Sequence, residues 1–156
     1  MSTRMEVFEL TVDHHTDDPV VILKADDGVT TLPIRIDLME AGAIAAGHEQ
    51  LCMARPLTHD VMHSVMAELG GVLESVEVTA LIDSTFYAEL KVRVEDALHT
   101  IDTRPSDAIA LALRANVDIF VNEHVLEQAA VLDTEQDRWR RYIESLDPED
   151  FGDYQM

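Results

Sequence analysis

The sequence has few of the features that mark secreted or membrane proteins. It contains a single cysteine, Cys52, so no disulfide can form within the chain, which favours a reducing compartment. No apolar run approaches the ~20 residues that a membrane-spanning helix needs. The first residues, Met1 to Glu6, hold no signal-peptide core. We therefore expect a cytoplasmic protein without a membrane segment.

Positive charge is also scarce. Lys and Arg together number 11 against 31 Asp and Glu, which gives a formal net charge of -20, and only Lys24 and Lys91 are lysines. Such a surface repels phosphate backbones at low salt and also repels itself. Concentrated salt would relieve both effects, because the Debye length falls to about 3 Å at 1 M. The composition therefore predicts an acidic protein adapted to a salt-rich cytoplasm.

What the chain does contain is typical of a folded globule. A length of 156 residues and a hydrophobic content of 47% provide for a domain with a sizeable core. We expect this domain to occupy residues 1–132, and a C-terminal helix with an acidic tail to occupy residues 133–156. The end of the chain is rich in Asp and Glu, which is typical of a loosely held terminus.

Alternation of apolar and polar residues predicts most of the strands. On the first strand this pattern places Phe8, Leu10 and Val12 on the buried face. The expected strands cover residues 6–12, 20–24, 31–36, 72–82, 86–94, 98–103 and 119–121.

Helical spacing and capping residues predict three helices around a fourth. Asp37 can cap the first of them, with Glu40 as its capping-box partner. Thr58 can cap the second, whose apolar stripe continues to Leu69. Another helix is expected from about Val125.

The chain is organised around the fourth helix. Its residues Ala108 to Leu113 are apolar without a break, so the helix must be buried on nearly every side. Pro105 suits the first helical position, and Ser106 or Asp107 can cap the exposed backbone N–H groups. Asn116 can take the left-handed conformation that ends a helix. This segment is either a core helix with a charged lid or a helix whose start forms part of a site.

A shift of 67 residues aligns the two halves of the chain weakly but in order. Glu40 then falls on Asp107, and both segments follow the order strand, turn, strand, helix. A duplicated strand-helix unit predicts an α+β fold, a two-layer sandwich of a mostly antiparallel sheet with helices on one face. Chance similarity between two Ala-rich helices is the alternative. The aligned pairs are Leu23 with Leu90, Lys24 with Lys91, Ile34 with Ile101, Ala41 with Ala108, Ala43 with Ala110, and Ala45 with Ala112.

Few residues stand out as carriers of chemistry. His59 and His63 have the i, i+4 spacing of a helical metal site, but no third ligand is evident, and two surface histidines are the alternative. Arg55 and Arg104 each precede a proline before a helix, where they can hold either a phosphate or an ion pair. Three carboxylates lie near helix starts and could hold Mg²⁺ or Mn²⁺, although carboxylates are common throughout the chain: Glu40, Asp60 and Asp107.

Several motifs together resemble the bifunctional nuclease domain family, over roughly residues 5–132. The resemblance implies a two-layer α+β fold with a repeated strand-helix unit, a homodimer, and nuclease activity on both DNA and RNA. The extra C-terminal motif of some bacterial members is not evident. The motifs are Leu32-Pro-Ile34, Glu40-Ala-Gly-Ala-Ile44, Arg55-Pro-Leu-Thr-His-Asp60, Thr85-Phe-Tyr-Ala88 and Arg104-Pro-Ser-Asp-Ala-Ile-Ala-Leu-Ala-Leu-Arg114.

Two hypotheses follow from the residues and the resemblance. In the first, the protein is a metal-assisted phosphodiesterase: carboxylates hold Mg²⁺ or Mn²⁺, His59 transfers a proton, and an arginine stabilises developing charge. In the second, it is a non-enzymatic oligomeric module for binding or regulation, and the same motifs are structural. The first hypothesis assigns catalysis to His59, Asp60, Arg104 and Asp107, substrate binding to Arg55, Thr58 and Ser106, and metal binding to Glu40 and Asp107.

Overall fold

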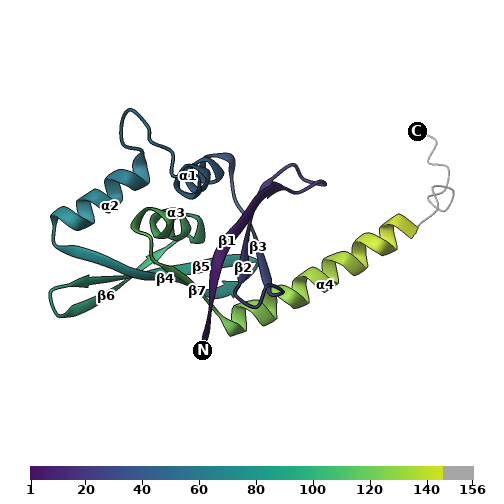
Figure 1. Cartoon of the computed structure of the whole chain (residues 1–156). Coiled ribbons are helices and arrows are strands. Elements are labelled where there is room, and N and C mark those ends of the chain that lie inside the picture. The colour runs from purple at the N-terminus through teal and green to yellow at the C-terminus, as the bar shows by residue number, and fades with distance from the viewer. Residues whose placement is uncertain (146–156) are drawn as a thin grey trace.

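A single mixed sheet forms the base of the molecule (Figure 1). The computed structural model describes residues 1–145, apart from the side chains of residues 131–137 and 140. The strand order is β3-β2-β1-β7-β4-β5-β6, and every neighbouring pair is antiparallel except β4 with β7. The strands are β1 (Ser2–Val12), β2 (Pro19–Ala25), β3 (Thr31–Arg35), β4 (Gly71–Ile82), β5 (Thr85–Val94), β6 (Ala97–Thr103) and β7 (Asp118–Asn122).

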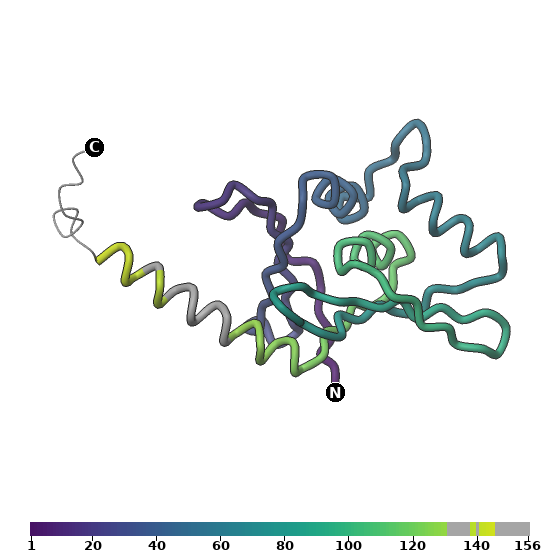
Figure 2. The backbone as a smooth tube through the Cα atoms, turned by 180° about the vertical axis from the view of Figure 1, so that it is seen from behind, coloured from purple at the N-terminus to yellow at the C-terminus, as the bar shows by residue number. Residues whose placement is uncertain are grey.

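Three helices cover one face of this sheet, which confirms the predicted α+β class: α1 (Leu38–His48), α2 (Thr58–Glu68) and α3 (Pro105–Ala115) (Figure 1). The fourth helix, α4 (Glu123–Ser145), directly follows β7. Its first turns pack on the core, and its yellow end at residues 141–145 lies away from the body of the fold (Figure 2). The predicted domain boundary after residue 132 therefore falls inside one continuous helix. The predicted acidic tail, residues 146–156, lies outside the described residues. None of the described helices is both long and apolar enough to cross a membrane.

The predicted internal repeat is visible in the topology. The units β1-β2-β3-α1 and β4-β5-β6-α3 have the same order, and α3 begins and ends 67 residues after α1 does. Strand β7 lies between the two units and pairs with β1 on one side and β4 on the other. The duplication therefore places the starts of α1 and α3 at equivalent positions over the sheet.

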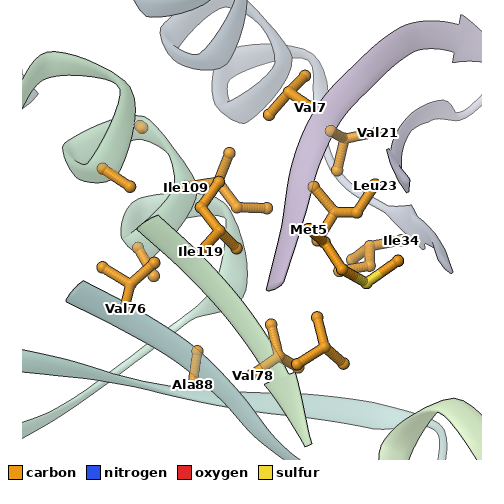
Figure 3. Close-up of a cluster of buried hydrophobic side chains, with 14 of the residues drawn as sticks. Met5, Val7, Val21, Leu23, Ile34, Val76, Val78, Ala88, Ile109 and Ile119 are labelled. Atoms are coloured by element: carbon orange, nitrogen blue, oxygen red, sulfur yellow. The ribbon is translucent and has the colours of Figure 1, made fainter. Parts of the chain in front are cut away.

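Helix α3 lies at the centre of the core, as its apolar sequence predicts. Pro105 occupies the first helical position, and Asn116 ends the helix with φ 53° and ψ 51°. Residues 108–112 are all buried. Figure 3 shows Ile109 between the side chains of one half of the sheet, such as Met5, and those of the other half, such as Val76. The helix is held on nearly every side by apolar contacts.

The predicted buried face of β1 is only partly right. Leu10 packs against the core as predicted, but Phe8 and Val12 are exposed, whereas Met5 and Val7 are buried. Val12 is the last residue of the strand. A bulge between Val7 and Glu9 shifts the alternation by one residue and turns Phe8 outward. The ring of Phe8 instead lies under the ammonium of Lys24, at 4.3 Å from the ring centroid.

Two predicted helix caps are also wrong. Arg104 is the N-cap of α3, and neither Ser106 nor Asp107 caps it, because both lie inside the first turn. Helix α2 begins at Thr58 and has Leu57 as its N-cap. No residue of α2 is buried, so its apolar stripe is largely solvent-exposed; the exposed members are Val61, Met62, Val65 and, just beyond the helix, Leu69.

Candidate functional site

The three helices on the sheet each carry a carboxylate at their third helical position. These residues are Glu40 in α1, Asp60 in α2 and Asp107 in α3. A negative charge is favourable there, because the N-terminal end of a helix carries partial positive charge. Glu40 completes a capping box with Asp37, and Asp60 accepts a hydrogen bond from the backbone N–H of Leu57. Asp107 instead turns toward side chains of other segments.

Five residues from all three helix starts form one connected group, here called the Arg104 cluster: Glu40, His59, Arg104, Ser106 and Asp107. Arg104 Nε donates to Asp107 Oδ2 at 2.8 Å, and its Nη1 lies 3.2 Å from Glu40 Oε1. The hydroxyl of Ser106 donates to the same Glu40 oxygen at 2.5 Å. His59 Nε2 lies 2.9 Å from Asp107 Oδ1. The two motifs singled out in the sequence therefore meet in space.

The charged groups of the cluster differ strongly in their exposure. The side chains of Glu40, His59 and Asp107 are 14%, 13% and 21% exposed, whereas that of Arg104 is 63% exposed. Burial alone would raise the pKa of Asp107, but hydrogen bonds from Arg104 and His59 outweigh it and hold this pKa below its usual value. The Asp107 carboxylate in turn raises the pKa of Arg104. At neutral pH the cluster thus presents a permanent guanidinium to solvent, held from behind by two carboxylates.

Arg104 lies at the edge of an open cleft of about 390 Å³ between β3 and the start of α3, here called the β3–α3 cleft. Its floor is apolar and includes Ile34, Ile36, Leu81 and Phe86. Ala129 of α4 also contributes to the lining. The turn between β4 and β5 supplies part of the rim. The polar lining residues are Arg35, Glu40, Ser84, Thr85, Arg104 and Ser106.

Arg35 adds a second positive charge to the cleft. Its side chain is 53% exposed, and Nη2 lies 3.1 Å from Asp13 Oδ2. Neither His59 nor Asp107 lines the cleft; Asp107 pairs with Arg104, which does, and His59 is linked to Arg104 only through Asp107. The cleft is therefore lined by two arginines, each with a carboxylate partner, and an imidazole–carboxylate pair adjoins Arg104.

The remaining predicted site residues lie apart from this cluster. Asp60 accepts a hydrogen bond at 2.7 Å from Nε of the largely buried Arg114, and both line a second cleft of about 380 Å³. The backbone bond from Leu57 and the bond from Arg114 lower the pKa of Asp60. Thr58 and Arg55 are exposed, and Arg55 contacts no carboxylate within the described residues.

The carboxylates do not fit the predicted divalent-metal site in this arrangement. Glu40 and Asp107 both pair with the guanidinium of Arg104, which occupies the place that a cation shared between them would take. Among the described residues, no group of three or more His, Cys, Asp or Glu side chains could hold a metal ion. A metal bound between these two carboxylates would have to displace Arg104.

Sequence reasoning did not assign Arg35, Ser84 and Phe86 to the site. They come from β3 and from the β4–β5 hairpin, so only the folded sheet brings them to the start of α3. A signal was nevertheless present in two motifs that carry the family resemblance: the first ends just before Arg35, and the second follows Ser84 and contains Phe86. These motifs are Leu32-Pro-Ile34 and Thr85-Phe-Tyr-Ala88.

Comparison with known proteins assigns the chain to a family. The model of the bifunctional nuclease domain matches residues 21–134, so the chain belongs to the bifunctional nuclease domain family. It is 35% identical over 161 residues to an uncharacterized protein of Mycobacterium tuberculosis, with 94% of this chain and 96% of that protein covered. It is 31% identical over 111 residues to "Bifunctional nuclease 1" of Arabidopsis thaliana, which covers 69% of this chain but only 34% of the plant protein. "Bifunctional nuclease 1" of Oryza sativa subsp. indica is 29% identical over 117 residues, again with 34% of its length covered.

Proposed function

We propose that this chain is a nuclease that hydrolyses phosphodiester bonds of DNA and RNA at the Arg104 cluster, beside the β3–α3 cleft. The observation that carries the proposal is the exposure of Arg104 at the cleft edge, while its partners Glu40 and Asp107 are sheltered. Nε and Nη2 of Arg104 donate to Asp107 and Nη1 lies beside Glu40, which leaves about two of the five guanidinium N–H donors for a phosphate. Planar guanidinium groups suit phosphate oxygens. The family match and the names of the plant relatives support this substrate class.

The residues of the cluster divide the chemistry between them. Arg104 and Arg35 bind the non-bridging phosphate oxygens and stabilise the charge that grows on them during attack. His59 supplies the imidazole that accepts and returns a proton, and Asp107 orients its ring. Water attacks phosphorus as the imidazole accepts its proton. The bond to the leaving sugar oxygen breaks, and that oxygen takes a proton back from the imidazolium.

The test is cleavage of single-stranded DNA and of RNA by the full chain in molar KCl. Separate reactions contain Mg²⁺, Mn²⁺ or EDTA, so that a metal requirement is measured directly. We expect His59→Ala and Asp107→Asn to lower cleavage at least about a hundredfold, as is typical for loss of a proton-transfer group. His63→Ala is the matched control, because it removes an imidazole one helical turn away from the cluster. Cleavage that survives both cluster variants contradicts the proposal.

The exposed face of α2 favours self-association, and with it the alternative of an oligomeric binding module. Helix α2 buries none of its residues, and Val61, Val65 and Leu69 lie exposed on it and at its end. A patch of this kind is typical of an interface. We propose that a second copy of the chain covers it in a homodimer. Light scattering in molar KCl should give twice the chain mass, and Val65→Glu should give the monomer, whereas the control Val29→Glu, in the β2–β3 turn, should not. A monomeric wild-type chain contradicts the homodimer.

A further inference from the structure

The lining of the β3–α3 cleft includes apolar groups that a phosphate alone would not use. Its floor is apolar, and the half-buried ring of Phe86 lies on the inward side of β5, where it packs at the edge of the core. Exposed Pro33 also lines the cleft. Phosphate groups are polar and gain nothing from such a surface, whereas the face of a nucleobase stacks well on aromatic side chains.

The size of the cleft limits what can enter it. A volume of about 390 Å³ lies at the small end of the range for ligand pockets, roughly 300–1,000 Å³. A double helix keeps its bases paired and stacked inside, out of reach of a side chain in a cleft of this size. An unpaired base, in contrast, can turn toward the protein and leave its backbone at the cleft edge.

The small number of positive charges also favours an unpaired strand over a duplex. Proteins that bind duplex DNA tightly make about 6–10 phosphate contacts with Lys and Arg. Here the chain has only 11 such residues, and several are held in ion pairs elsewhere on the body. Arg4, Lys91, Arg93 and Arg114 are paired in this way. Arg35 and Arg104 are also paired, with Asp13 and with Glu40 and Asp107, but both are more than half exposed and both line the cleft. They can contact about two phosphates, which suits a short stretch of single strand.

We propose that the β3–α3 cleft selects one unpaired nucleotide of a single strand, with the base on Phe86 and the adjoining phosphate between Arg35 and Arg104. The inference rests on the proposed function in that it assigns the substrate form to the same cleft. The acidic surface around the cleft disfavours a long duplex footprint, because each additional phosphate meets carboxylates instead of cations.

The test is equilibrium binding of the full chain to a fluorescein-labelled thymidine octamer and to a labelled DNA hairpin duplex, measured by anisotropy across a KCl series. Each oligonucleotide is checked to be intact afterwards. We expect at least tenfold tighter binding of the octamer. The slope of log affinity against log KCl concentration should be no steeper than about -1.4, as two phosphate contacts predict for a single strand.

Variants separate the contribution of the base to octamer binding from the contribution of the phosphate. Phe86→Leu keeps the site apolar and should weaken octamer binding roughly tenfold through lost stacking. Tyr87→Leu is the control, since the next side chain along β5 lies on the opposite face of the sheet. Arg35→Gln should make the salt dependence shallower, and Arg93→Gln, an equal charge change beside Glu74, should not. Thermal melting of each variant shows that it is folded.

Equal affinity for hairpin and octamer overturns the inference, as does unchanged octamer binding by folded Phe86→Leu, or a slope several-fold steeper. The test of strand selectivity and the test of hydrolysis can succeed or fail independently. If the chain cleaves duplex and single strand at equal rates and Phe86→Leu has no effect, the protein is a nuclease that does not select an unpaired nucleotide. If the chain binds the octamer selectively but cleaves no substrate, the cleft binds an unpaired nucleotide and the proposed hydrolysis is contradicted.

Discussion

His59 Nε2 and Asp107 Oδ1 lie 2.9 Å apart, although 48 residues separate them in the chain. This contact joins the start of α2 to the start of α3. Helix α2 has no fully buried residue, and only Met66 of its side chains packs against the core from a half-buried position, so polar contacts at its first turn also help to fix it on the fold. Asp60 makes the other such contact, with Arg114 of α3. The proposed proton-transfer residue and the residue that attaches the helix to α3 are therefore neighbours in one motif.

Asp107→Asn should destabilise the protein at neutral pH by about 1.5–3 kcal/mol, because the carboxylate accepts hydrogen bonds from Arg104 and His59. The pKa of Asp107 is lowered in the folded state, so its contribution is present above the pKa of the unfolded chain. That contribution is lost as pH falls through the folded value. Urea unfolding of both proteins between pH 7 and pH 3 should show the difference shrinking toward acid. A difference that grows toward acid would contradict this assignment.

Arg114→Met should cost about 2–3 kcal/mol. The side chain is only 8% exposed, and its guanidinium donates to Asp60, to the Ala43 carbonyl of α1 and to the Ala110 carbonyl of α3. Its loss leaves the Asp60 charge unpaired, although partial exposure of Asp60 reduces the penalty that a fully buried pair would carry. Arg93→Met is the control, because that exposed pair with Glu74 should contribute at most about 1 kcal/mol. Thermal or urea unfolding measures both, and equal costs would contradict the assigned role.

The order of strands and helices could be predicted from the sequence because each element carries a local signal. The capping box of Asp37 and Glu40 forms as predicted, and the apolar run of α3 is buried as its composition requires. The outward position of Phe8 on β1 could not be predicted, because the bulge there shifts the alternation and leaves no local signal in the sequence. Bulges depend on pairing with another strand, which a local pattern does not contain.

The candidate site was predictable only in part, for a similar reason. The equivalence of Glu40 and Asp107 follows from the repeat, and the structure places both beside Arg104. His59 and Asp60 are adjacent in the sequence, so their adjacency alone did not predict that they contact different partners. Neighbouring residues on a helix point about 100° apart, so one faces Asp107 and the other faces Arg114. Arg35 and Phe86 required the tertiary fold, since distant strands bring them to the cleft.

Two glycines of α1 should respond oppositely to the same substitution. A Cβ at Gly42 meets nothing within 4 Å, so Gly42→Ala should stabilise the protein by about 1 kcal/mol through helix propensity. A Cβ at Gly47 would lie 2.9 Å from Arg114 Nη1 and 3.1 Å from Leu113 Cβ. Because hydrogen bonds hold that guanidinium in place, α1 and α3 must separate, and Gly47→Ala should cost about 1–3 kcal/mol. Urea unfolding at neutral pH measures both, and stabilisation by Gly47→Ala would show that the two helices are not closely packed there.

The melting temperature should rise as KCl is raised from low concentration to molar. Salt has two opposing effects on this molecule. It weakens surface ion pairs such as Arg4 with Asp118, but each exposed pair contributes at most about 1 kcal/mol. It also screens the repulsion that arises from a net charge of -20, and this term involves every unpaired carboxylate on the surface. The second effect should therefore dominate.

A charge-reduced variant separates screening from other effects of concentrated salt. Asp17→Asn together with Asp18→Asn removes two adjacent charges from an exposed turn, and Asn tolerates the positive φ of 59° at position 17. The double variant should melt higher than the wild type at low KCl, and the gap should close toward molar KCl because screening leaves less repulsion to remove. Calorimetry across the KCl series measures this convergence. A wild-type melting temperature that falls with KCl, or a gap that widens, would mean that excess negative charge does not limit the stability of the fold.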